Sequence, residues 1–597
     1  MGLGLWLLLG LLGLAALWAH ATHPAGQFTR GGQPHGDGTY HYAQVRSLVL
    51  DGDLRLANDY TLVGNPHRQP VREDGWAGSH FTVGTAITWI PSFVVAHAVT
   101  RGGDALGWWD DPGDGSSARC QRITMLGSVA SGWLALVLIA MTLRRWYGRR
   151  TVGVVVVLVA ASTPLWWYMT RQPSWSHAAS ALAVAGLVHA CVRGDVARGA
   201  RYGAAVGLWL GLVVLVRPQD VVFAVVPLAS VLGAMRRSDT RAPAMRAAAA
   251  LTVGAATCWL PQAWVWHQTY GSAWVISQGA GFMRWSHSQW DLVLWSSRGG
   301  LLPWSPLCAV AILGTAYSAI KGPTRALARA LGVSLLAAVY VCGAAEDWWG
   351  GWAFGARRLV SASVVFALGW AALLEPVLAR KRGGVVVRLL VVVAVLGGVR
   401  LSSQLRRDYL MGTLERGVPQ AMSPVWSRAF GLPLEPAFGA VGTPGSWPAS
   451  WVFAWRTGAP AGRYDETMGW ALVHERRGEG GRSRLWVQHP RWAVHGWGPA
   501  DLTRTHPPRA VEGEAVLAIP LREPLSVALR MRAWSARGAT VHASTSTGEH
   551  FELQLRPGWH DVDVPLQRPL GAGLNLLRLR PLSGARVEVL WVDVFDR

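Results

Sequence analysis

The feature that most constrains the fold is a repeated alternation of long apolar segments and short arginine-rich loops over the first 400 residues. An apolar run of about 20 residues crosses a bilayer as a helix, and loops rich in Lys and Arg remain on the cytoplasmic side. The clearest case is the apolar segment 123–143, which is followed by four arginines within 144–150. The alternation therefore predicts a polytopic α-helical membrane protein in which each loop has a defined side.

The apolar segments predict about eleven membrane-spanning helices. They are 2–19, 123–143, 152–169, 178–192, 202–216, 221–235, 247–266, 301–320, 328–345, 359–378 and 384–400. Every loop that this order assigns to the cytoplasm is basic, namely 144–150, 193–201, 236–246, 321–329 and 380–382. The N-terminus is then cytoplasmic, and the chain after residue 400 lies on the outer side.

Residues 2–19 admit two interpretations. Ala19-His20-Ala21 offers a small-x-small cleavage site for a signal peptide, but no Lys or Arg precedes the apolar run as a signal peptide requires. We favour an uncleaved membrane anchor. In both interpretations the segment that follows lies outside the cytoplasm.

The first outer loop, 20–122, is predicted to contain two helices near the membrane. Apolar residues recur at helical spacing between 40 and 52, which indicates an amphipathic surface helix or, alternatively, an ordinary loop helix. The segment 81–98 is apolar enough to span the bilayer, but Pro91 interrupts it. If the N-terminus and the basic loop 144–150 are both cytoplasmic, 81–98 cannot cross the membrane. It is therefore expected to be a juxtamembrane or re-entrant helix.

Composition separates the chain from soluble and nucleic-acid-binding classes. The 597 residues are 51% hydrophobic and only 15% charged, as expected for several bilayer spans. The formal charge of +21 comes mostly from the loop arginines, so it favours contact with anionic lipid over nucleic acid. The five cysteines are widely spaced and indicate neither a disulfide framework nor a metal knuckle.

The C-terminal third has a different pattern. Residues 401–509 form a Pro- and Trp-rich connector, and from about 510 to 597 apolar residues alternate with polar ones between Gly and Pro turns. The clearest alternating sets are 525–531, 551–555, 562–566, 577–579 and 587–591. Alternation with a period of two predicts antiparallel strands with one buried face, and hence a small β-sandwich-like domain.

The first 400 residues resemble the GT-C superfamily of polyprenyl-phosphate-sugar-dependent glycosyltransferases, which includes protein O-mannosyltransferases and the aminoarabinose transferase of lipid A. That family carries an acidic motif in the first outer loop. Here the matching residues are Asp37-Gly38, followed by Tyr40-His41-Tyr42 and Arg46-Ser47-Leu48. Many members have Asp-Glu where this chain has Asp37-Gly38, which leaves no counterpart for the second acid, and the C-terminal β domain gives no match.

The resemblance implies a site on the outer face. Asp37 would be the general base that takes the proton of the acceptor hydroxyl, although Asp-Gly is also a frequent turn sequence. The donor phosphate would be bound by Arg357 first, and by Arg358, Arg298 and Arg217, although each of these arginines also suits an ordinary contact with lipid phosphate. Residues expected to orient the substrate are His177, Tyr40, Glu346, Asp347 and Trp349.

His177, Glu346 and Asp347 leave a divalent cation open as a cofactor, but no further ligands accompany them at metal-like spacing, so we expect no obligatory metal or other cofactor.

The implied function is an inverting transfer of sugar from a polyprenyl-phosphate donor to a glycan, lipid or protein acceptor. It would occur at the outer face of a bacterial inner membrane, with the C-terminal domain in the periplasm. A transporter or flippase of lipid-linked glycans is the alternative, and it predicts charges at mid-span and symmetric halves, neither of which is evident. A third class is a polysaccharide-binding scaffold, for which eleven spans are far more than anchoring needs. The sugar and the acceptor are not encoded in any recognisable motif.

Overall fold

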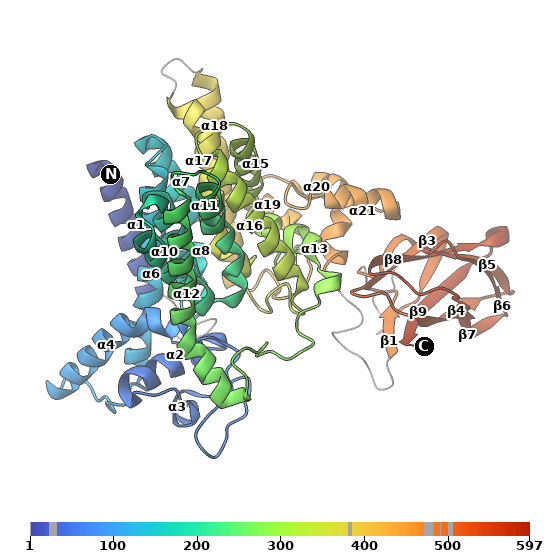
Figure 1. The fold of residues 1–597 in the computed structure, drawn as a ribbon. Coiled ribbons are helices and arrows are strands. Elements are labelled where there is room, and N and C mark those ends of the chain that lie inside the picture. The colour runs from blue at the N-terminus through green and yellow to red at the C-terminus, as the bar shows by residue number, and fades with distance from the viewer. Residues whose placement is uncertain are drawn as a thin grey trace. The chain divides into compact units, whose positions relative to one another are not determined.

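The computed structural model describes residues 2–22, 33–379, 385–470, 482–489, 491–499 and 506–596. The chain divides into two compact units (Figure 1). The first unit comprises Met1–Met283, Ser305–Cys342 and Ala356–Leu410. The second unit comprises Arg284–Trp304, Gly343–Gly355 and Met411–Arg597.

The first unit is helical, and a helix lies at every predicted span. The helices are α1 (Leu3–Ala21), α6 (Leu126–Leu143), α7 (Arg149–Ser162), α8 (Leu165–Thr170), α9 (His177–Arg193), η2 (Val196–Arg198), α10 (Ala200–Val216), η3 (Pro218–Ala224), α11 (Val225–Met235), α12 (Arg241–Tyr270), α15 (Leu307–Ile320), α16 (Arg325–Ala344), η5 (Arg357–Ala362), α17 (Ser363–Ala379) and α18 (Val385–Leu410). Among the described residues, six helical stretches are long and apolar enough to cross a membrane, and three shorter apolar helices accompany them. The membrane-type helical fold is confirmed, and the total of eleven spans stays a prediction.

The first outer loop is also helical where the sequence predicts it. It contains α2 (Asp37–Arg46), its continuation η1 (Ser47–Asp51), α3 (Ala57–Val63), α4 (Gly84–Ala105) and α5 (Ala118–Thr124). Tyr42 and Val45 of α2 are fully buried and pack against Trp89 and Phe93 of α4. These two side chains are covered by protein, whereas Leu48, Val49 and Leu50 are only partly buried, so both interpretations of the helix at 40–52 stay predictions.

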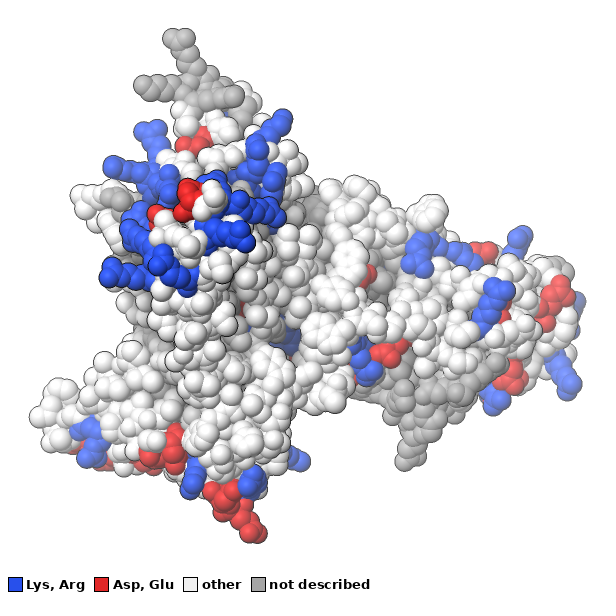
Figure 2. Space-filling view, viewed as in Figure 1, with Lys and Arg blue, Asp and Glu red and all other residues white. Residues whose placement is uncertain are grey.

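The basic loops lie at one end of the first unit. Figure 2 shows Lys and Arg gathered over that end, above a belt that is almost free of charged side chains. Helix α9 starts at His177 and ends at Arg193, and its 17 residues correspond to a length of about 25 Å. Helix α10 packs against α9 and returns from Arg201 to Arg217. Residues 177 and 217 therefore lie at the end opposite the basic loops, whereas the predicted basic loop 380–382 falls outside the described residues.

Glycines spaced four residues apart let α10 approach α12 closely. A Cβ atom added at Gly203 would lie 2.1 Å from the carbonyl oxygen of Ala247, and one added at Gly207 would lie 2.4 Å from that of Leu251. Gly211 continues the row and faces Cys258. Small residues at this spacing allow helix backbones to pack in direct contact, which is a common means of helix association in membranes.

The second unit combines short helices with a sheet. Its helices are η4 (Trp285–His287), α13 (Trp290–Trp295), α14 (Leu301–Trp304), α19 (Ser423–Phe430), α20 (Glu435–Val441), α21 (Ala449–Thr457), η6 (Ala461–Arg463), α22 (Tyr464–Thr467) and η7 (Leu582–Gly584). Its strands are β1 (Arg482–Trp486), β2 (Ala493–Trp497), β3 (Arg509–Leu521), β4 (Val527–Ser535), β5 (Ala539–Thr545), β6 (His550–Leu555), β7 (Gly558–Val564), β8 (Gly573–Pro581) and β9 (Val587–Asp596). The strand-rich C-terminal domain is confirmed, and β1 and β2 add to it ahead of residue 510.

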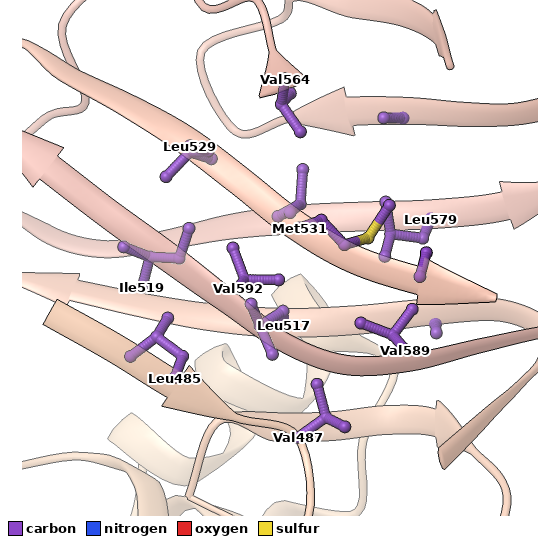
Figure 3. Packing of buried hydrophobic residues seen from close by; sticks show 14 of the residues in the cluster. Leu485, Val487, Leu517, Ile519, Leu529, Met531, Val564, Leu579, Val589 and Val592 are labelled. Atoms are coloured by element: carbon purple, nitrogen blue, oxygen red, sulfur yellow. The ribbon is translucent and has the colours of Figure 1, made fainter. Parts of the chain in front are cut away.

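All the strand pairs are antiparallel, in the order β6-β5-β8-β3-β9-β4-β7, with β1 on β9 and β2 on β3. Side chains from β3 and β8 and from β1, β4 and β9 point into one apolar core (Figure 3). A register shift in the β4–β9 pair lies opposite Arg532 and Ala533. It changes the phase of β9, so Val592 and Val594 are buried as well as Val587 and Val589.

The second unit also contains a buried carboxyl group. Asp465 of α22 is 1% exposed, and Thr443 donates a hydrogen bond of 3.4 Å to its Oδ2 atom. Its Oδ1 atom has no hydrogen-bond partner within the described ranges. Burial raises the pKa of Asp465 from 3.8 to about 7, and the hydrogen bonds it accepts only partly oppose this.

We expect Gly207→Val to destabilise the first unit by about 1–3 kcal/mol, because the new side chain meets the α12 backbone. The measurement is thermal unfolding of the full chain in detergent. Gly10→Val in α1 is the matched control, since a Cβ atom at Gly10 has no neighbour within 4 Å. Equal stability of the two variants would contradict close α10–α12 packing.

We expect Asp465→Asn to be more stable than the parent at high pH. Because the pKa of Asp465 is raised in the folded state, its contribution to the free energy of unfolding is fully present below pH 3.8. That contribution is lost as the pH rises through about 7, where the buried group must ionise. The gain should reach about 4 kcal/mol at pH 8 and vanish near pH 4. Unfolding midpoints of the full chain at the two pH values check this, and a gain of equal size at both would refute the assignment.

Candidate functional site

Two glycines set the backbone on either side of Asp37, the first residue of α2. Gly36 has φ 52° and ψ −124°, a conformation that residues with a Cβ atom rarely adopt. At Gly38 an added Cβ would lie 2.3 Å from the Cβ and 2.6 Å from the carbonyl oxygen of Ser174. The 174–175 loop thus occupies the space that a second acidic side chain would need, which accounts for Gly at position 38.

The Asp37 carboxylate has two charged or polar neighbours from distant parts of the chain. Its Oδ2 atom lies 2.9 Å from Nη1 of Arg357, and its Oδ1 atom lies 3.5 Å from Nε2 of His67. The side chains of Asp37 and Arg357 are 21% and 13% exposed. Burial alone would raise the pKa of Asp37, but the charge of Arg357 and the hydrogen bond from His67 outweigh it and hold this pKa well below its usual range. Asp37 is therefore a carboxylate at any physiological pH.

Arg357 is held in place by an aromatic ring. Its guanidinium carbon lies 4.4 Å above the centre of the Trp175 ring, a cation–π geometry. Trp175 in turn stacks on Tyr168 at 6.0 Å and donates from its indole nitrogen to the carbonyl oxygen of His35 at 3.4 Å. The guanidinium group thus lies between a tryptophan face and the Asp37 carboxylate.

A second cation belongs to the same cluster. Arg217 donates to Nδ1 of His177, and because arginine only donates, Nδ1 is the acceptor and the His177 proton is on Nε2. The Arg217 guanidinium also lies 3.8 Å from Asp220. Ser180 and Ser361 donate to the two Asp220 oxygens at 2.5 and 3.0 Å, so Asp220 ties α9 to η5.

The cluster brings several positive charges together. The guanidinium groups of Arg217, Arg357 and Arg358 act on one another electrostatically, and the carboxylates of Asp37 and Asp220 lie beside Arg357 and Arg217. Burial lowers the pKa of Arg217; Asp220 opposes this, whereas the charges of Arg358 and Arg357 act in the same direction as burial. Cations that repel one another at one helix end are stabilised by an anion, and a phosphate oxygen is well suited to bind them.

Tyr40 positions His67. Its hydroxyl donates to Oδ1 of Asn65 at 2.7 Å and accepts from the backbone amide of His67 at 2.8 Å. Its ring is stacked on the His67 imidazole with centres 5.3 Å apart. Tyr40 is fully buried, so in this structure it supports the imidazole and does not itself present its ring to a substrate.

Four predicted residues belong to the second unit. Arg298 donates to the carbonyl oxygens of Gly417 and Gly469 at 2.7 and 2.9 Å, and its guanidinium carbon lies 3.7 Å above the Trp349 ring. Glu346 accepts from Arg522 through its backbone oxygen, and Asp347 accepts from the amide of Gly350 at 2.6 Å. A role of Arg298, Glu346, Asp347 or Trp349 toward a substrate stays a prediction. Over the described ranges, no group of three or more His, Cys, Asp or Glu residues has the arrangement of a metal site.

The structure therefore joins Asp37, Arg357, Arg358, Arg217 and His177 in one unit and adds three residues that the sequence did not single out. These are His67, Trp175 and Asp220. Trp175 and Asp220 lie within three residues of His177 and Arg217 in the sequence, so proximity in sequence was the available indication. His67 lies 30 positions from Asp37, and nothing in its local pattern marks it.

The chain matches no known protein family and no curated protein. Among solved structures it is similar to ArnT from Cupriavidus metallidurans bound to undecaprenyl phosphate, with 13% identity and a TM-score of 0.41 over 76% of this chain and 80% of ArnT. It is also similar to the archaeal oligosaccharyltransferase AglB from Archaeoglobus fulgidus in complex with an inhibitory peptide and a dolichol-phosphate, with 13% identity and a TM-score of 0.42 over 68% of this chain and 56% of AglB. The arabinosyltransferase EmbB from Mycobacterium smegmatis is similar with 12% identity and a TM-score of 0.35 over 99% of this chain and 64% of EmbB.

With TM-scores of 0.42 or less, these similarities carry no argument about this chain. The function proposed below therefore rests on the geometry of this chain's own residues.

We expect Gly38→Ala to lower the thermal stability of the first unit, because the new methyl group collides with Ser174. Overpacking of this kind costs about 1–3 kcal/mol. Thermal unfolding in detergent measures the loss. Gly102→Ala in α4 is the control, since a Cβ atom there has no neighbour within 4 Å; a Gly38→Ala variant as stable as this control would show that the 174–175 loop does not exclude a side chain.

Proposed function

We propose that the protein is a membrane glycosyltransferase that takes a sugar from a polyprenyl-phosphate donor and transfers it to an acceptor on the outer face of the membrane. The observation that carries the proposal is the cluster in which the Asp37 carboxylate lies 2.9 Å from Arg357, with Arg217 and Arg358 beside it. The cluster lies at the end of the first unit opposite the basic loops. It supplies a base and several phosphate ligands in one place, which are the two requirements of this reaction.

The proposed reaction inverts the anomeric centre. The acceptor hydroxyl oxygen attacks the anomeric carbon from the face opposite the phosphate, and the bond between that carbon and the phosphate oxygen breaks. The polyprenyl phosphate leaves with the bonding electron pair. Asp37 takes the proton of the acceptor hydroxyl. Atoms and charge balance without a further reactant.

The arginines stabilise the leaving group. Negative charge develops on the phosphate oxygens as the bond breaks, and fixed guanidinium groups in a partly buried site lower the energy of that charge. Trp175 keeps the Arg357 guanidinium in one orientation. Asp220 and His177 do the same for Arg217, so the site is preorganised before the donor arrives.

The basic loops support the orientation. Loops rich in arginine remain in the cytoplasm, so the opposite end, which carries Asp37, faces outward. We place the protein in a bacterial inner membrane with a cytoplasmic N-terminus and a periplasmic C-terminal domain. The acceptor is then a glycan, lipid or protein in the periplasm.

We expect Asp37→Asn to reduce transfer of labelled sugar from polyprenyl-phosphate donors by about 10²- to 10⁴-fold, because the base is lost. The assay uses membranes that contain the full chain, with and without a chelator, and we expect the chelator to leave the parent rate unchanged. Asp74→Asn is the control, since Asp74 is half exposed and pairs with Arg72 away from the cluster.

Undiminished transfer by Asp37→Asn would refute the role of Asp37 as base. If the parent protein instead moves lipid-linked sugar across vesicles while no glycosidic bond forms, the protein is a transporter and the glycosyltransferase proposal is wrong.

A further inference from the structure

The proposed base and the proposed phosphate ligand are bound to each other. Asp37 Oδ2 and Arg357 Nη1 are 2.9 Å apart, and both side chains are mostly buried. The same two groups have different tasks in the reaction, one toward the acceptor and one toward the donor. Each is therefore occupied by the other in this structure.

Arg217 and Arg357 are held by different kinds of contact. Arg217 is held by His177, and Asp220 beside it is fixed by two serine hydroxyls. Arg357 rests on Trp175, a contact with the face of the guanidinium group. Ligand oxygens bind a guanidinium group at its edge and in its plane. Asp37 binds Arg357 at Nη1, so a phosphate that approaches Nη1 meets the carboxylate first.

We propose that the donor phosphate competes with Asp37 for Arg357, so that Asp37 is released to act as a base only when the donor is bound. This inference rests on the proposed function and adds an order of binding to it. Phosphate has the advantage in the competition because its two non-bridging oxygens share the negative charge and reach Arg357, Arg217 and Arg358 together. The Asp37 carboxylate pairs with Arg357 at 2.9 Å and has His67 at 3.5 Å as its other neighbour.

The competition has a chemical consequence. A carboxylate paired with a guanidinium group is a poor proton acceptor, because its neighbour stabilises the charged form. When the phosphate neutralises Arg357, the pKa of Asp37 rises toward its ordinary value and its basicity improves. His67 remains beside Oδ1 and keeps the carboxylate oriented. The acceptor hydroxyl is thus activated after the donor has bound and not before.

The test measures binding of a polyprenyl monophosphate to the full chain in detergent micelles. Removing the competitor should strengthen binding, so Asp37→Asn should bind about fivefold more tightly than the parent although it transfers sugar far more slowly. Arg357→Ala should bind more weakly. In the double variant the gain from Asp37→Asn should disappear, because the group for which Asp37 competes is absent.

Asp74→Asn removes the same charge from the exposed Arg72–Asp74 pair and should bind as the parent does. Asp37→Ala serves as a second neutral variant, and thermal unfolding identifies any variant that is misfolded. Binding by folded Asp37→Asn and Asp37→Ala that is equal to or weaker than that of the parent overturns the competition and leaves the proposed function in place. Equal strengthening by Asp74→Asn overturns it in favour of a general charge effect. Absence of binding by the parent and all variants overturns the proposed function together with the inference.

Discussion

The requirement that each helix cross the bilayer and return brings together residues that are far apart in sequence. A buried backbone must satisfy its polar groups internally, so the chain crosses as complete helices and can present irregular segments only at their ends. Asp37 opens α2, Arg217 follows α10, and Arg357 opens η5. All three lie at helix ends on the side away from the arginine-rich loops. The ion pair between residues 37 and 357 is a direct product of this constraint.

Charge at such a position must be supported by neighbours. Moving an arginine toward the hydrocarbon is costly, and partners reduce that cost. Arg357 has a carboxylate and a tryptophan face, and Arg217 has an imidazole and a carboxylate. Asp220 has two serine hydroxyls as donors. The cluster is therefore assembled from groups that each lower the cost of burying another.

The sequence indicated the parts of the site that depend on topology. The predicted membrane topology assigned Asp37, Arg217, His177 and Arg357 to the same side of the membrane, and all four lie in the first unit of the structure. It did not indicate His67 or Trp175, because side-chain contacts depend on how loops fold back and not on periodicity. In the C-terminal domain, alternation located the strands, but it missed the phase change in β9, since one inserted residue shifts every later side chain to the other face. It also missed β1 and β2, which are too short to alternate clearly.

Gly38 stands where the acidic motif has a second acid, and its lack of a side chain permits the contact between Trp175 and Arg357. The backbone at Ser174 approaches Gly38 so closely that no side chain fits between them. The next residue, Trp175, lies under the Arg357 guanidinium. A glutamate at position 38 would push the 174–175 loop outward and carry Trp175 away from Arg357, so a second acid and this tryptophan contact cannot coexist in the present backbone. The chain thus retains one acidic residue at this point and gains a fixed orientation for the arginine that faces it.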